Sequence, residues 1–248
     1  MNKQQHPRYI HHELNHHVSH TWRSKVLHSL REIIFGLQDG IVSTLGAITG
    51  IAGGVQDHRI VILSGCVVIV VESISMAAGT FLSSKSAREV DERMLWEEEQ
   101  EIEKNPAGER AELVEFYRAR GFLPEEIEIV VNRITSDKKL WLEEMAFKEL
   151  RVIPQYDGTP KTDALFMGVS YVFGGLVPLV SYFFLPIATA LPTSLFSSIA
   201  ILFGIGYVKG RMVHVNRLRS GLEMMMISFT AAAFGYMVGQ IAAHFFGI

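Results

Sequence analysis

The residues with the clearest chemical potential are two acids and a methionine that lie in apolar stretches of the chain. Asp39 falls in the apolar block 33–55, and Glu72 falls near the middle of the block 60–82. Met76 follows Glu72 by four positions, so both side chains share one face of a helix. A carboxylate with a thioether suits a borderline or soft divalent ion better than magnesium. An acid in a membrane helix usually faces a bundle interior or a water-filled path.

Each of the two acids could also have a purely structural role, without binding an ion. Asp39 would be an interfacial carboxylate at a helix end, and Glu72 would be a structural hydrogen-bond partner. Met76 would then be an ordinary packing residue, as most of the ten methionines are expected to be.

A second group of acids lies in the polar stretch between the second and third apolar blocks. Residues 89–150 contain 18 acidic and 9 basic residues. Glutamates recur there at a spacing of three, and a methionine precedes a glutamate by four, so each pair projects from one helix face. Carboxylates from several helices bind divalent metals in di-iron bundles. The alternative is a solvated charged surface. The candidate metal ligands are Glu98, Glu101, Glu109, Glu112, Met145 and Glu149.

Helices must position these residues, and the distribution of apolar residues predicts them. The chain has 248 residues, is 48% hydrophobic and has a mean hydropathy of +0.22. A bilayer core needs about 20 apolar residues per helix. Five blocks approach this length, at 33–55, 60–82, 164–185, 190–208 and 222–246. The sequence therefore predicts an all-α integral membrane protein with five transmembrane helices.

The polar stretch between the second and third spans predicts a small helical domain. A break is expected at 105–108, with helices over 109–120, 124–134 and 137–150. Residues 83–104 read as a polar continuation of the second span. The expected organisation is a His-rich tail over 1–24, two spans over 25–84, a metal-binding domain over 85–160, and three spans over 161–248.

Loop charges predict the orientation in the membrane, because cytoplasmic loops carry an excess of Lys and Arg. Basic residues gather before the first span and between the fourth and fifth spans. They are Arg23, Lys25, Arg31, Lys209, Arg211, Arg217 and Arg219. We therefore expect the N-terminus and the acidic domain in the cytoplasm and the C-terminus outside.

Other functional classes find little support in the sequence. Cys66 is the only cysteine, which excludes disulfides within the chain and a thiolate metal cluster. No hydrolytic triad, nucleotide loop or cofactor motif is present, so we expect neither an enzyme nor a permanent cofactor. The expected partners are the lipid bilayer and small ions, and no nucleic acid.

The order of several segments resembles the vacuolar iron transporter family, also described as iron/manganese transporters, over roughly residues 25–247. No one segment is specific, but their order and separations are. The segments are Asp39-Gly40-Ile41-Val42-Ser43-Thr44, Ser73-Ile74-Ser75-Met76, Glu144-Met145-Ala146-Phe147-Lys148-Glu149-Leu150 and Gly174-Gly175-Leu176-Val177-Pro178.

The resemblance implies a homodimer of five-span protomers that exchanges cytoplasmic Fe²⁺ or Mn²⁺ for protons, with Zn²⁺ and Co²⁺ as further candidate ions. It places Asp39 and Met76 on the translocation path, and the six ligands of the acidic stretch in a cytoplasmic metal-binding domain. The family's path glutamate often lies where this chain has Val68, and Ala146 replaces a second methionine. Glu72 is the path acid here, a variant expected of prokaryotic members and hence of a prokaryotic inner membrane. The alternative function is a membrane-anchored metal-sensing or storage module without transport.

Overall fold

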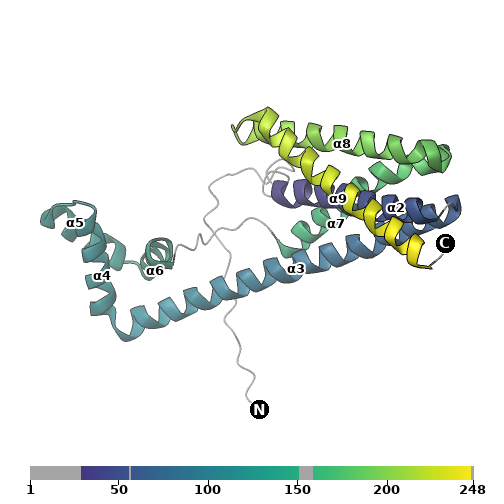
Figure 1. The fold of residues 1–248 in the computed structure, drawn as a ribbon. Helices are drawn as coiled ribbons and strands as arrows, with labels where there is room; N and C mark the ends of the chain where they lie inside the picture. The colour runs from purple at the N-terminus through teal and green to yellow at the C-terminus, as the bar shows by residue number, and fades with distance from the viewer. Residues whose placement is uncertain (1–28, 56, 151–158, 247–248) are drawn as a thin grey trace, which may run out of the picture.

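The structure is a computed structural model that describes residues 29–55, 57–150 and 159–246. Within these ranges every regular element is a helix, which confirms the all-α prediction (Figure 1). The His-rich tail expected over 1–24 lies outside the described residues.

Five helices are long and apolar enough to cross a membrane, as the hydropathy pattern predicts. These helices are α2 (Leu30–Gly54), α3 (His58–Lys104), α7 (Pro160–Phe184), α8 (Ile187–Met212) and α9 (Arg217–Phe246). Four of them begin and end within about five residues of the expected blocks, and α3 begins near its block but continues to Lys104. α2 lies at the centre of the bundle and packs mainly against α7 and α9, while α3 packs on α7 and α8 packs on α9.

α3 is one continuous helix of 47 residues, as expected from the polar continuation of the second span. At 1.5 Å per residue it is about 70 Å long, more than twice a bilayer core of about 30 Å. Its charged half carries ion pairs at a spacing of four, which support an exposed helix. They are Lys85–Glu89 at 3.5 Å, Arg88–Glu92 at 2.9 Å and Arg93–Glu97 at 2.8 Å. α3 thereby extends far from the bundle (Figure 1).

The charged end of α3 and the helices after it form a second cluster away from the bundle (Figure 1). We call residues 85–150 the polar insert. Its helices are α4 (Pro106–Ala119), α5 (Pro124–Thr135), α6 (Lys138–Met145) and the π-helical turn η1 (Ala146–Leu150). Its core consists of Ile102, Leu113, Tyr117, Ile127, Val131, Ile134, Trp141 and Met145.

Two expected boundaries in the polar insert differ from the structure. α4 begins at Pro106, three residues before the expected start, because the Asn105 side chain accepts a hydrogen bond from the Gly108 amide at 3.1 Å. Proline at the first helical position suits this arrangement. The helix expected over 137–150 changes at Ala146 into the π-helical η1, a feature often found at functional sites.

A buried polar network joins α6 and η1 to α4. The Tyr117 hydroxyl donates to Glu144 at 2.7 Å, Lys148 pairs with Glu144, and the Lys148 ammonium lies 3.4 Å from the centre of the Tyr117 ring. Burial and the Glu144 carboxylate raise the pKa of Tyr117. Burial works to raise the pKa of Glu144 as well, but hydrogen bonds from Lys148 and Tyr117 outweigh it and leave that pKa below its ordinary value.

Glycines allow α2 to approach its neighbours at backbone distance, as in other membrane helix pairs. A methyl group added at Gly40 would lie 2.3 Å from the carbonyl oxygen of Tyr171 in α7. One added at Gly50 would lie 2.7 Å from the carbonyl oxygen of Gly235 in α9. The glycines of α2 therefore allow close packing on two sides of the helix, against α7 and against α9.

We expect Gly239→Ala to destabilise the bundle, because the added methyl group would lie 2.0 Å from the carbonyl oxygen of Gly50. Overpacking of this kind costs on the order of 1–3 kcal/mol. Gly204→Ala is the matched control, since no other described segment places an atom within 4 Å of that methyl group. Thermal unfolding in detergent should give a lower midpoint for Gly239→Ala alone. Equal midpoints for the two variants would contradict the close α2–α9 contact.

We also expect Glu144 to make the polar insert sensitive to acid. Its folded-state pKa lies below the ordinary value, so the carboxylate stabilises the fold above about pH 4.3. This contribution is lost as the pH falls through the folded-state pKa. Denaturant unfolding, followed by tryptophan fluorescence below about pH 5, should show a steeper loss of stability in the wild type than in Glu144→Gln. A parallel decline in both proteins would rule Glu144 out as the responsible group.

Candidate functional site

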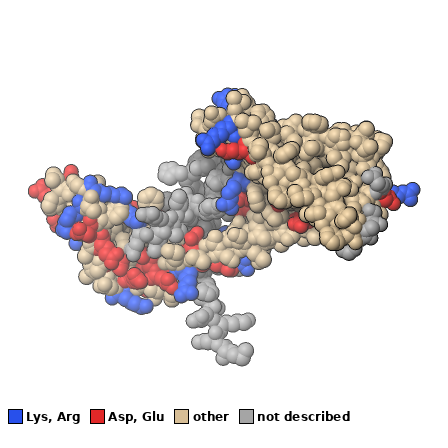
Figure 2. All heavy atoms as spheres, viewed as in Figure 1, with Lys and Arg blue, Asp and Glu red and all other residues tan. Residues whose placement is uncertain are grey.

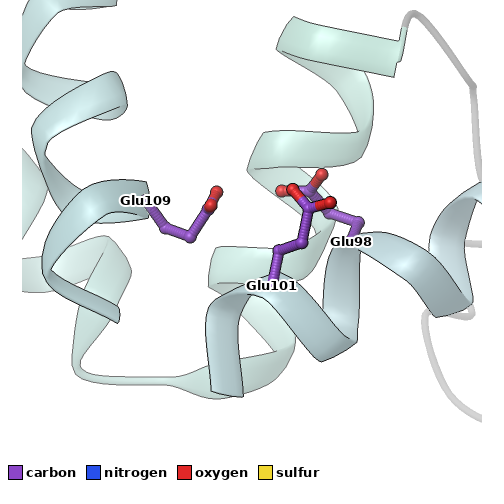
Figure 3. Close-up of side chains that lie close together, drawn as sticks. All are labelled: Glu98, Glu101 and Glu109. Atoms are coloured by element: carbon purple, nitrogen blue, oxygen red, sulfur yellow. The ribbon is translucent and has the colours of Figure 1, made fainter. Parts of the chain in front are cut away.

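Three of the predicted ligands converge in the polar insert. Glu98 and Glu101 project from the last turns of α3, and Glu109 reaches toward them from the first turn of α4 (Figure 3). One carboxylate oxygen from each lies within 4.8 Å of the other two. Glu98 and Glu109 are only 3% and 4% exposed, whereas Glu101 is exposed. The break at Asn105 makes this possible, because it turns α4 back against the end of α3.

The spacing of these carboxylates suits a divalent cation. Two like charges 4.8 Å apart repel by about 3 kcal/mol at an effective dielectric constant of about 20. A divalent ion between them would replace this repulsion with attraction. Carboxylate oxygens suit manganese, magnesium and calcium, and they do not by themselves select iron. The cluster is therefore chemically able to bind a divalent metal, with one exposed side for exchange.

The other three ligands expected in this stretch lie differently. Glu112 is exposed on α4 and is outside the group of three carboxylates. Met145 is 2% exposed and belongs to the same hydrophobic core as Ile102, the neighbour of Glu101. Glu149 belongs to η1, and its side chain is outside the described part of the structure.

A second polar site lies within the membrane-spanning helices. Asp39 of α2 is half-buried and is close enough to Glu72 of α3 to interact with it electrostatically. The Ser43 hydroxyl donates to the Asp39 carbonyl at 2.7 Å and also bonds the hydroxyl of Tyr171 in α7. Because Ser43 has one proton to donate, Tyr171 is the donor in the second bond. Three helices thus contribute polar groups to one site.

Tyr171 and Ser43 were not singled out by sequence reasoning. Ser43 carried a weak signal, since it follows Asp39 by four positions and shares its helix face. Tyr171 carried none, because a tyrosine in an apolar span is common. Tyr171 is fully buried, and only the packing of α7 on α2 brings it to Ser43.

Glu72 does not lie in the interior of the protomer, although its position in an apolar span suggested that it would. α3 turns Gly65, Ile69 and Ser73 toward the bundle, at intervals of four. Glu72, on the flank of this buried side, is nevertheless exposed, and Met76 is only half-buried. The side of α3 that faces away from the bundle carries exposed apolar residues, namely Leu63, Val67, Val70, Val71 and Ile74. A carboxylate exposed to lipid is costly, so we expect another surface to cover Glu72 in the membrane.

Comparisons with known proteins identify the family of this chain. A family model described as the VIT family matches residues 30–240, which contain both polar sites. Vacuolar iron transporter 2 of Oryza sativa subsp. japonica is 34% identical over 209 residues, covering 83% of this chain and 85% of that protein. Vacuolar iron transporter of Centaurea cyanus is 32% identical over 235 residues, covering 94% and 95%. The match to the family model over most of its length shows that the chain belongs to the VIT family.

Proposed function

We propose that the protein transports divalent iron across a membrane, with Mn²⁺ as a second cargo. Its relatives are named vacuolar iron transporters, so a transport function is supported over an enzymatic one. The observation that carries the proposal is the presence of two acids, Asp39 and Glu72, in neighbouring apolar helices and near enough to interact electrostatically. The presence of these acids favours transport over a membrane-anchored sensor or store, because an anchor has no need of intramembrane acids. Zn²⁺ and Co²⁺ are further candidate cargoes with suitable ligand chemistry.

The polar insert would collect the metal on the cytoplasmic side. Its carboxylate cluster of Glu98, Glu101 and Glu109 is half open to solvent, which suits exchange better than storage. Met145 and Glu149 lie at the start and end of the turn into η1, from which they would join the ligands. Glu112 would attract ions to the cluster from the surface. Under this proposal the insert is a metal-binding domain that raises the metal concentration at the mouth of the path.

The path itself would lie between two copies of the chain. A homodimer formed along α3 would cover Glu72, which a single protomer leaves exposed. It would also place two copies of Glu72 and Met76 in a shared interior, opposite Asp39. This removes the cost of a lipid-facing carboxylate and supplies a carboxylate–thioether ligand set for a divalent ion.

Protons would drive export from the cytoplasm. Metal binding requires deprotonated carboxylates, so protons and metal compete for Asp39 and Glu72. An inward proton gradient would release the metal on the far side and reset the site. The basic residues around the α8–α9 turn support a cytoplasmic N-terminus and an outside C-terminus. We place the protein in a prokaryotic inner membrane, on the position of Glu72 one helical turn before Met76.

We expect Glu72→Gln to reduce Fe²⁺ and Mn²⁺ flux to near the level of protein-free liposomes, because the neutral amide cannot exchange metal for protons. Glu223→Gln is the control, since Glu223 is an exposed acid that pairs with Arg219 at 3.0 Å. The measurement is metal uptake into proteoliposomes with and without a pH gradient. The proposed mechanism would be wrong if metal flux were unchanged in Glu72→Gln. It would also be wrong if metal flux through the wild type did not depend on the pH gradient.

We expect Glu98→Gln and Glu109→Gln each to weaken Mn²⁺ binding by roughly tenfold or more, since each removes a full negative charge beside the ion. Glu128→Gln is the control, because Glu128 is an exposed glutamate of α5 outside the cluster. Calorimetric titration of the purified chain measures the dissociation constants. If Glu128→Gln weakened binding equally, the effect would be that of overall charge, and the cluster would not be the binding site.

A further inference from the structure

The turn between α8 and α9 carries exposed basic residues at the end of the apolar bundle. Lys209 and Arg211 lie in the last turn of α8, and Arg217 and Arg219 lie at the start of α9. All four side chains are exposed. Figure 2 shows basic side chains gathered at this edge, beside a bundle surface almost without charge. We call the segment from Lys209 to Arg219 the basic turn.

Close backbone contact fixes the shape of the basic turn. A methyl group added at Gly210 would lie 2.9 Å from the Cα atom of Arg217, so the end of α8 touches the start of α9. The Val215 amide donates to the Gly210 carbonyl at 3.0 Å, and His214 reverses the chain with a φ of 57°. Four basic side chains are thereby presented together rather than along an extended loop.

Most of this positive charge has no acidic partner. The sequence contains no Asp or Glu between Asp163 and Glu223. Arg219 pairs with Glu223, but among the described residues Lys209, Arg211 and Arg217 form no ion pair. The basic residues of α3 differ, because Lys85, Arg88 and Arg93 each pair with a glutamate four positions later. The basic turn therefore offers three uncompensated cations at the boundary of the bundle.

Apolar side chains alternate with these cations. Met212, Val213, Val215 and Leu218 are 44%, 58%, 54% and 61% exposed. Basic residues interleaved with exposed apolar ones are typical of segments that lie in the membrane interface. The long Lys and Arg side chains reach the headgroup level while their stems cover apolar surface.

We propose that the basic turn binds the phosphate groups of anionic phospholipids in the leaflet that it faces. The site does not depend on the transport mechanism or on the metal ligands. The acidic polar insert of the same or a second copy is the competing partner for these cations. Lipid is favoured because an ionic contact with the insert gives no role to the exposed Val213, Val215 and Leu218, which a bilayer interface would cover.

The test compares two triple variants of the full chain that lose the same charge. Lys209→Gln/Arg211→Gln/Arg217→Gln removes the unpaired cations, and Lys85→Gln/Arg88→Gln/Arg93→Gln removes paired ones. Native mass spectrometry and thermal unfolding in detergent measure binding of added phosphatidylglycerol, with phosphatidylcholine as the neutral lipid. Each basic residue near an anionic surface contributes about fivefold in affinity, so three contribute on the order of 100-fold. If the triple variant of the basic turn does not purify, each single variant should show about fivefold weaker binding.

We expect the basic-turn variant alone to lose phosphatidylglycerol binding and its thermal stabilisation. Equal binding by that variant and the wild type would overturn the proposal, as would an equal loss in the α3 control. Release of the lipid by soluble glycerol phosphate at a similar concentration would show that the site takes free phosphate and not a lipid. A different result would be that the basic-turn variant alone loses stability in neutral detergent without added lipid, in a salt-sensitive way. That result would contradict lipid binding and would indicate that the basic turn forms an ionic contact with the acidic polar insert.

Discussion

The structure depends on the close backbone contact of α2 with α7 and α9. Lipid tails are as apolar as the helix surfaces, so packing and polar contacts must hold the membrane helices together. Glycines at Gly40 and Gly50 remove the side chains that would keep the backbones apart. This approach also brings Asp39 and Ser43 of α2 to Tyr171 of α7. The same contact that stabilises the bundle therefore assembles its polar site, and separating the helices would disrupt both.

α3 connects the two candidate metal sites as one rigid element. Glu72 lies in its apolar half and Glu98 in its charged half, about 40 Å apart along the helix axis. Such a helix cannot bring the two sites together without bending, so any metal bound at the insert would have to travel to the bundle. A rigid connection also means that a tilt of α3 at the face carrying Glu72 would move the insert.

Charge is segregated along the molecule in a way that fits a membrane boundary. The polar insert holds most of the acids, the face of the bundle seen in Figure 2 is almost free of charge, and the basic turn lies at one end of the bundle. Acids that repel one another at short range attract cations from solution, whereas unpaired bases beside exposed apolar residues suit an anionic interface. The fold keeps these two kinds of surface apart because the charged half of α3 extends away from the bundle (Figure 1).

The sequence by itself determined the five spans, the continuous α3, the helical character of the polar insert and the family. These features follow from the lengths of apolar runs, from turn residues such as Asn105 and Pro106, and from spacings along one helix. Only the tertiary structure decided that Glu109 joins Glu98 and Glu101 while Glu112 faces solvent. It also decided that the Glu72 side chain is exposed on the surface of the protomer and that the Tyr171 hydroxyl forms a hydrogen bond with Ser43. Such contacts depend on how each helix is rotated about its axis and on which helices meet, and neither is encoded in the periodicity of a single segment.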